Sequence, residues 1–298
     1  MKRFTALLSF FILISACQEK KVKTNKPKLV IGIVVDQMRY DYLNRFSDRY
    51  GENGFKKLIK NGFSLENAHY SYIPTYTAVG HASIFTGTTP NNHGVISNNW
   101  YDKFLKKSIY CVTDESYITI GNQTDAGKRS PKRLFTSTIS DQLNLAQNKK
   151  GKTIGIAIKD RSAILPIGHS ADAAYWFQGY DQGQWISSSF YMNKLPEWVS
   201  NFNNSKIADQ YLTSNWNTLY NIDTYTNSIN DDNIFENLFV GESTSTFPHN
   251  IPELRKDNGN FNILKAIPAG NTFTFDFAKA AIENEKLGER NGIYIFNV

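Results

Sequence analysis

Two continuous apolar runs and two segments of helical spacing outline the ordered part of the chain. Residues 29–35 (Leu-Val-Ile-Gly-Ile-Val-Val) and 153–158 (Thr-Ile-Gly-Ile-Ala-Ile) are rich in β-branched side chains, which is typical of strands buried on both faces of a parallel sheet. Apolar positions recur at helical spacing in 38–60, before Gly62, and a second helix is predicted around 135–147. Alternating strands and helices predict an α/β fold with a mostly parallel sheet.

Residues 175–250 have a different character, rich in Tyr, Trp, Asn and Ser with little periodicity. We therefore expect an insertion or cap region over 175–270 that is irregular and adds no layer of sheet. Its tryptophans either pack the insertion onto the body or line a ligand cleft, and packing is the expected role. A helix in 275–286 then returns the chain to the core. The tryptophans concerned are Trp176, Trp185, Trp198 and Trp216.

The N-terminus reads as an export signal. Lys2 and Arg3 precede a short apolar run, too short for a spanning helix, and Ile14-Ser-Ala-Cys17 looks like a bacterial lipobox. We expect a lipoprotein signal peptide at 1–16, lipidation of Cys17 and a polar, basic tether at 17–28. This predicts a periplasmic or outer-membrane protein that meets the membrane only through its lipid anchor. The alternative is an ordinary signal peptide with an incidental cysteine.

Composition narrows the function classes further. The 298 residues are 41% hydrophobic, enough for a sizeable core, and the net charge of +6 includes several cations in the first 28 residues. Nucleic-acid binding is therefore not implied. Lipidation of Cys17 would leave Cys111 as the remaining thiol, so we expect no structural disulfide and a packed, inert Cys111.

The first candidate catalytic residue is a threonine at the start of a predicted helix. Residues 74–87 predict a turn, a helix that begins near Thr77 and a stop at Gly87. The positive helix end and a bound divalent cation would both stabilise an alkoxide on Thr77, although a plain N-cap threonine gives the same pattern. Asp36 ends the first strand, where open α/β sheets place their ligand sites, but a loop or cap role is the alternative.

The segments around Asp36, Thr77 and 89–102, taken in order, resemble the type I phosphodiesterase/nucleotide pyrophosphatase branch of the alkaline-phosphatase superfamily. Within it they are most similar to the bacterial periplasmic phosphate-irrepressible alkaline phosphatases. The resemblance implies an alkaline-phosphatase-like α/β/α sandwich, with residues 29–174 as the N-terminal part of its catalytic domain. It also implies that Asp36 and Thr77 ligate one of two zinc ions, that Thr77 is the nucleophile and that Asn98 contacts the phosphoryl oxygens. His81 and His93 match no ligand position and are expected to be structural.

Lys159 and Arg161, after the second strand, resemble the cation pair with which the monoesterase branch holds a phosphate dianion. A monoester carries one negative charge more than a diester, which suits a guanidinium fork plus an ammonium group. Alternation along an extended strand predicts both side chains on one face and Asp160 on the other. Surface ion pairs at a solvated strand end are the alternative.

The resemblance implies a phosphomonoester hydrolase acting through a phosphothreonine on Thr77. A phosphodiesterase or nucleotide pyrophosphatase of the same fold is the alternative enzyme, and a non-catalytic envelope lipoprotein is the alternative of another class. The family's other zinc ligands have no counterpart before Val298, and 289–298 no longer resemble the family. We therefore expect an incomplete zinc site and, over 271–298, a return to a core helix followed by a truncated, divergent tail.

Overall fold

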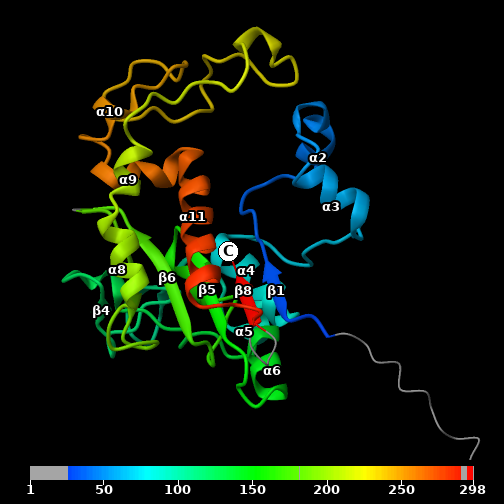
Figure 1. Ribbon diagram of the computed structural model, residues 1–298, viewed down its shortest axis with the longest axis vertical. Coiled ribbons are helices and arrows are strands. Elements are labelled where there is room, and N and C mark those ends of the chain that lie inside the picture. The colour runs from blue at the N-terminus through cyan, green and yellow to red at the C-terminus, as the bar shows by residue number, and fades with distance from the viewer. Residues whose placement is uncertain (1–25, 181, 290–293, 298) are drawn as a thin grey trace, which may run out of the picture.

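The computed structural model describes residues 26–180, 182–289 and 294–297 (Figure 1). The predicted signal peptide, the predicted lipidation site Cys17 and most of the predicted tether lie outside the described residues. Within the described part of the chain, no helix has the length and apolar character needed to cross a membrane.

A six-stranded sheet forms the centre of the fold, in the order β1-β8-β5-β6-β7-β4. Strands β1, β8, β5 and β6 run parallel, whereas β7 and β4 join by antiparallel pairing. The predicted α/β fold is confirmed, and the sheet is mixed, with three parallel and two antiparallel pairings among the described strands. The strands are β1 (Leu29–Gly32), β4 (Thr119–Ile120), β5 (Thr153–Ala157), β6 (Ala173–Gln178), β7 (Gln184–Ser188) and β8 (Tyr294–Asn297), and β2 (Asn99–Asp102) and β3 (Lys107–Tyr110) form a separate antiparallel pair.

The two predicted strands differ in burial. Every residue of β5 is buried, as the sequence predicts. The prediction is wrong for β1, where Val30 is 41% and Ile31 47% exposed. The reason is position. Among the described strands, β1 lies at one edge of the sheet and pairs with β8 alone, whereas the hydrophobic core is centred on β5 and β6.

The sequence analysis missed β6, β7 and β8, three strands of the central sheet that lie in two regions of the chain. Residues 173–188 form β6 and β7, so the expectation of no sheet from residue 175 onward is wrong for this stretch, where an apolar run crosses the core. The tail carries β8, which inserts between β1 and β5 with Tyr294 opposite Leu29 and Ile295 opposite Thr153. The run Tyr294-Ile-Phe has the aromatic and β-branched side chains of a strand, but it is too short to stand out in the sequence.

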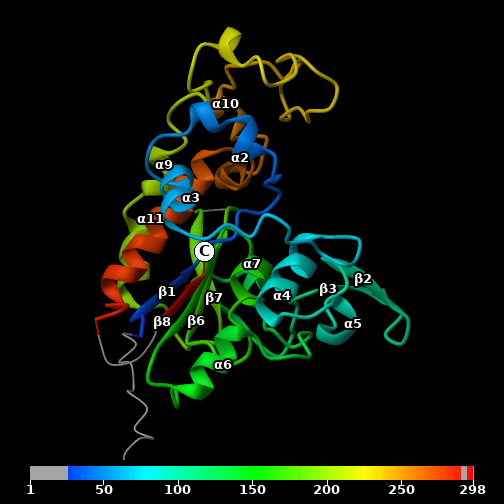
Figure 2. The same cartoon turned by 90° about the vertical axis from the view of Figure 1, so that its right-hand side faces the viewer.

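Helices cover both faces of the sheet, as Figure 2 shows. On one face, α11 and α8 pack against β5, β6 and β7 around Phe273, Phe277 and Val199. On the other face, α4 and α7 pack around Ala78, Ala82 and Ile164. The long helices are α4 (Thr77–Thr86), α6 (Ile139–Ala146), α8 (Glu197–Asn204) and α11 (Ala269–Asn284).

Shorter helices complete the fold. The predicted helical segment 38–60 is divided at its glycines, and Gly62 caps its last piece as expected. The segment between Ser188 and α11 is largely irregular apart from α8, α9, α10 and two 3-10 turns. The short elements are α2 (Tyr42–Arg45), η1 (Ser47–Arg49), α3 (Phe55–Asn61), α5 (Pro90–His93), η2 (Asp125–Gly127), α7 (Asp160–Ile164), α9 (Ile207–Gln210), η3 (Ile222–Thr224), α10 (Ile251–Leu254) and η4 (Asn260–Ala266).

A capping box fixes the start of α6, four residues later than the start of the predicted helix. The Thr138 side chain accepts from the Asp141 amide at 3.1 Å, and the Asp141 carboxylate accepts from the Thr138 amide at 2.9 Å. The other oxygen of Asp141 accepts from the amides of His169 and Ser170 at 2.9 and 2.8 Å. This buried carboxylate therefore ties α6 to the segment that leads into β6.

Trp185 and Trp198 pack against α11, as expected, and Trp176 packs in the core on the other face of the sheet. Trp216 lines a cavity in the insertion, which is the alternative role. The Trp185 ring stacks on Phe277 with centroids 4.2 Å apart, and the Trp198 indole donates to Glu285 at 2.9 Å. Trp185 is 1% exposed and Phe277 is fully buried. These contacts join the segment after β6 to the core.

Replacing Phe277 with Ala is expected to lower the free energy of unfolding by about 3–5 kcal/mol, because the lost ring leaves a cavity beneath Trp185. Phe275→Ala is the matched control on the same helix, since Phe275 is 39% exposed. Urea unfolding followed by tryptophan fluorescence measures both. Equal losses in the two variants would contradict this description of the core.

Candidate active site

Thr77 and Asp36 meet at the carboxyl-end edge of the sheet. The Thr77 hydroxyl donates to Asp36 Oδ2 at 2.9 Å, linking the first residue of α4 to the loop after β1. The N-cap of α4 is Tyr76, so Thr77 is not a plain N-cap residue, and its hydroxyl is held outside the helix by a carboxylate. Gly87 ends the helix in the left-handed conformation, with φ 66°, as the sequence predicts.

Asn98 is attached to the same helix end. Its Oδ1 accepts from the Ala78 amide at 2.9 Å, which satisfies one of the free N–H groups of the first turn. The Asn98 side-chain NH2 has no protein partner within the described ranges of the chain and remains available to donate to an anion. Asp36, Thr77 and Asn98, which are far apart in sequence, are therefore joined by two hydrogen bonds at one helix N-terminus.

Lys159 and Arg161 lie at the end of β5, but not in the predicted geometry. The strand stops at Ala157, Lys159 is the N-cap of α7 and Arg161 lies within that helix. The prediction of alternating strand faces is therefore wrong, because Asp160-Arg-Ser-Ala-Ile is helical. Asp160 does not point away from Arg161 either, since its Oδ1 accepts from the Arg161 amide at 2.8 Å.

Lys159 nevertheless interacts electrostatically with both Arg161 and Asp36. Desolvation and the charge of Arg161 lower the pKa of Lys159 from its usual value, and the charges of Asp36 and Asp160 oppose this effect. Lys159 is therefore within electrostatic range of both the Asp36 carboxylate and the Arg161 guanidinium. Burial and the nearby Arg161 charge disfavour the protonated form of Lys159, so a negatively charged ligand beside it would be stabilising.

Lys265, at the end of η4, is a third cation at this edge that the sequence analysis did not identify. Burial lowers its pKa, Asp160 raises it, and Lys159 and Arg161 lower it again. Within the described part of the chain it has no carboxylate within ion-pair distance. It is over 100 residues from Lys159 in sequence and belongs to no motif. Only the packing of η4 beside Ile158, at the end of β5, brings it here.

The residues that the structure describes do not complete a zinc centre. Asp36 and Thr77 offer two oxygen donors, whereas catalytic zinc usually has three protein ligands. In the described ranges, no group of three or more His, Cys, Asp and Glu side chains is arranged to hold a metal ion.

The histidines near the helix make internal hydrogen bonds, in line with the expected structural role. His81 Nδ1 lies 2.8 Å from the Thr77 carbonyl oxygen. His93 is fully buried, with its Nε2 2.9 Å from Ser83 Oγ and its Nδ1 accepting from the Val95 amide at 3.2 Å. His93 therefore joins α5 to α4 as a neutral ring.

Cys111 is buried as a free thiol, and burial first, then the charge of Asp160, raises its pKa to about 12. A thiol with such a pKa holds its proton at neutral pH and is a weak nucleophile. The prediction that Cys111 is packed is confirmed, and its raised pKa agrees with the expectation of an inert thiol.

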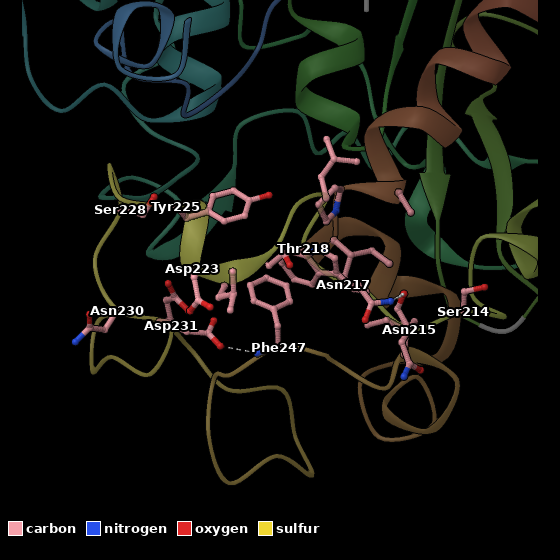
Figure 3. Close-up of a pocket in the computed structure, with 18 of the residues that line it drawn as sticks. Ser214, Asn215, Asn217, Thr218, Asp223, Tyr225, Ser228, Asn230, Asp231 and Phe247 are labelled. Carbon is pink, nitrogen blue, oxygen red and sulfur yellow. Dashed lines mark hydrogen bonds between the residues drawn. The ribbon is translucent and has the colours of Figure 1, made fainter. Parts of the chain in front are cut away.

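A cavity of about 1490 Å³ lies in the insertion, and Figure 3 shows its lining. Tyr225, Asp231 and Phe247 face it, and Asp231 Oδ2 accepts from the Phe247 amide at 3.0 Å. None of Asp36, Thr77, Asn98, Lys159 and Arg161 lines this cavity. The space is therefore separate from the constellation around Thr77.

Comparison with known proteins identifies relatives over most of the chain. The model of the family described as type I phosphodiesterase / nucleotide pyrophosphatase matches residues 30–252. A Myroides odoratus protein named calcium-transporting ATPase is 51% identical, covering 95% of this chain and 51% of that protein. Alkaline phosphatase PhoV of Synechococcus elongatus is 49% identical, covering 89% of this chain and 48% of PhoV.

Among solved structures, wild-type alkaline phosphatase PafA superposes with a TM-score of 0.88 at 42% identity, covering 92% of this chain and 53% of PafA. A second PafA structure carries a combined substitution of a threonine, an asparagine, a lysine and an arginine. The chain thus spans about half the length of the relatives it matches.

Burial lowers the pKa of His93 below its ordinary value of 6.5. His93 therefore binds a proton more readily in the unfolded state than in the folded state. The free energy of unfolding is unaffected by protonation of this residue above about pH 6.5 and decreases as pH falls from there towards the folded-state pKa. His93→Gln is expected to flatten this loss, though not abolish it, because burial also lowers the pKa of His81. Urea unfolding across this pH range measures the slope. An unchanged slope in the variant would contradict the buried, neutral His93.

Proposed function

Because the chain belongs to the type I phosphodiesterase / nucleotide pyrophosphatase family, we propose that its site hydrolyses phosphate monoesters with Thr77 as the nucleophile. The observation that carries the proposal is the position of the Thr77 hydroxyl, which lies at a helix N-terminus and is hydrogen-bonded to Asp36 at 2.9 Å. The relatives carry two kinds of name, and the constellation around Thr77 favours the phosphatase activity over ion transport.

Thr77 is held in a geometry suited to attack. Its O–H bond points at the Asp36 carboxylate, so the oxygen lone pairs face away from that carboxylate. The positive end of α4 stabilises negative charge that develops on the oxygen. In the proposed reaction, Thr77 Oγ1 forms a bond to phosphorus as its proton passes to the Asp36 carboxylate that it contacts. The ester P–O bond breaks, and the leaving alkoxide takes a proton from water and departs as the alcohol. Water then attacks the phosphothreonine, which releases phosphate and restores the hydroxyl group.

The cations at the end of β5 support a monoester as the substrate. Lys159 and Arg161 would meet the non-bridging phosphoryl oxygens, and the free NH2 of Asn98 would donate to the same group. A monoester dianion gains more from two cations than a diester monoanion does, because each contact is weighted by the ligand charge. The PafA variant supports the assignment, since it replaces the same four residue types in the same order along the chain.

Thr77→Ala is expected to lower hydrolysis of a simple aryl phosphate by at least about 10³-fold, because no other hydroxyl takes this place. Thr77→Ser keeps a hydroxyl and should retain part of the activity. Thr86→Ala is the matched control at the other end of α4, where the Thr86 hydroxyl donates to the Ala82 carbonyl at 2.7 Å. Activity is measured as released phenol in zinc-containing buffer. Full turnover by Thr77→Ala would exclude Thr77 as the nucleophile.

Neutralising either cation distinguishes the monoesterase from the phosphodiesterase alternative. Lys159→Ala and Arg161→Ala are each expected to lower kcat/KM for the aryl phosphate by about 10- to 100-fold, the value of a charge-assisted hydrogen bond. The loss for the matching aryl phosphodiester should be smaller. Unchanged monoester turnover with reduced diester turnover would favour the phosphodiesterase. No turnover of either ester by the unmutated chain would favour the non-catalytic alternative.

A further inference from the structure

A network of polar contacts joins Arg161 to three further side chains that take no part in the proposed reaction. Arg161 Nη1 donates to the Tyr110 hydroxyl at 3.0 Å, and that hydroxyl donates in turn to Asp160 Oδ1. Asp160 Oδ2 pairs with Arg129 Nε at 2.7 Å. Tyr110 comes from β3, Arg129 follows η2, and Asp160 and Arg161 begin α7, so three separate segments meet here.

Of the two arginines in this network, only Arg129 forms an ion pair with Asp160. The Asp160 and Arg129 side chains are only 13% and 20% exposed and form a direct ion pair. Arg161 has no ion pair within 4.0 Å in the described ranges, and its buried Nε has no hydrogen-bond partner there. Asp160 is therefore neutralised by Arg129, while the charge of Arg161 stays free for a ligand.

The Tyr110 phenol connects the two arginines without cancelling the charge of Arg161. Burial first, then the charge of Asp160, raises the pKa of Tyr110 well above its usual range. The hydroxyl therefore keeps its single hydrogen for Asp160 and offers only lone pairs to Arg161. The Arg129 guanidinium also lies over the Tyr110 ring, 5.3 Å from its centroid, which holds the ring in place.

A phenol suits this task better than a carboxylate. A carboxylate in contact with Arg161 would orient the guanidinium, but it would also neutralise the positive charge that binds the substrate. A neutral hydroxyl orients the guanidinium and leaves its charge unpaired. The fixed donor loses less side-chain entropy when it meets a phosphoryl oxygen.

We propose that Tyr110, held by Asp160 and Arg129, is a positioning residue that fixes the Arg161 guanidinium for a phosphate dianion and thereby contributes to the preference for monoesters. The inference deepens the proposed function and rests on it. It also gives the small β2–β3 sheet a role, since this sheet carries Tyr110 to Arg161.

Tyr110→Phe tests the idea, because it keeps the ring and its contact with Arg129 and removes only the hydroxyl. We expect kcat/KM for an aryl phosphate to fall about 10-fold, the value of a hydrogen bond to a charged group, and the dissociation constant for inorganic phosphate to rise by a similar factor. Turnover of the matching aryl phosphodiester should change less than about twofold. In the Arg161→Ala background the Tyr110→Phe substitution should have no further effect.

Tyr101→Phe is the matched control, since Tyr101 lies in β2 of the same small sheet and is 63% exposed. It should leave all three measurements unchanged. A Tyr110→Phe variant with unchanged monoester turnover and phosphate affinity, while Arg161→Ala loses both, would overturn the inference and leave the proposed function standing. Equal losses for both esters, or losses that multiply in the double variant, would also overturn it. If the unmutated chain neither turns over the monoester nor binds phosphate, the proposed function fails, and this inference fails with it.

Discussion

The site depends on the parallel pairing of β1, β8 and β5, because parallel strands bring their carboxyl ends to the same edge of the sheet. Asp36 follows β1 and Lys159 follows β5, so residues more than 100 positions apart become neighbours. Strand β8 fills the position between β1 and β5 and sets the spacing of these two ends. This register places Asp36, which follows β1, within hydrogen-bond distance of the Thr77 hydroxyl.

The charges at this edge are arranged in favour of an anion. Lys159, Arg161 and Lys265 influence one another, and of the two nearby carboxylates Asp160 is paired with Arg129. Asp36 is the carboxylate left to face them, and it accepts the Thr77 hydroxyl. The local balance is therefore positive where a phosphoryl group would bind, although the chain as a whole has only a modest net charge of +6. A dianion restores this balance better than a monoanion does.

Local patterns predicted much of this arrangement from the sequence. The buried run of β5, the helix from Thr77 to the Gly87 stop and a helix within 135–147 each follow from signals within a few residues. The Thr138–Asp141 capping box that starts α6 was not predicted. Packing of Trp185 and Trp198 was expected as the commoner role of such side chains. The hydrogen bond between Thr77 and Asp36 is non-local and was not predicted. The ordered set of motifs implied only that both residues lie at one zinc ion.

The missed features depend on contacts that a linear pattern does not contain. Strand β8 is short and gains its place by pairing with two neighbours, and α7 replaces the expected strand end after Lys159. Residues 29–35 were predicted to be buried on both faces, but β1 lies at an edge of the sheet, so part of this run is exposed. Lys265 and Tyr110 reach the site from segments without any motif, so only the folded arrangement identifies them.

The most direct test of the central claim is to trap the covalent intermediate. The chain would be mixed with excess aryl phosphate, quenched in acid within the first turnover and digested, and the peptide that contains Thr77 would be analysed by mass spectrometry. The account predicts a phosphoryl group on Thr77, absent from the acid-quenched chain without substrate. Turnover that proceeds with the phosphoryl group on another side chain would contradict it.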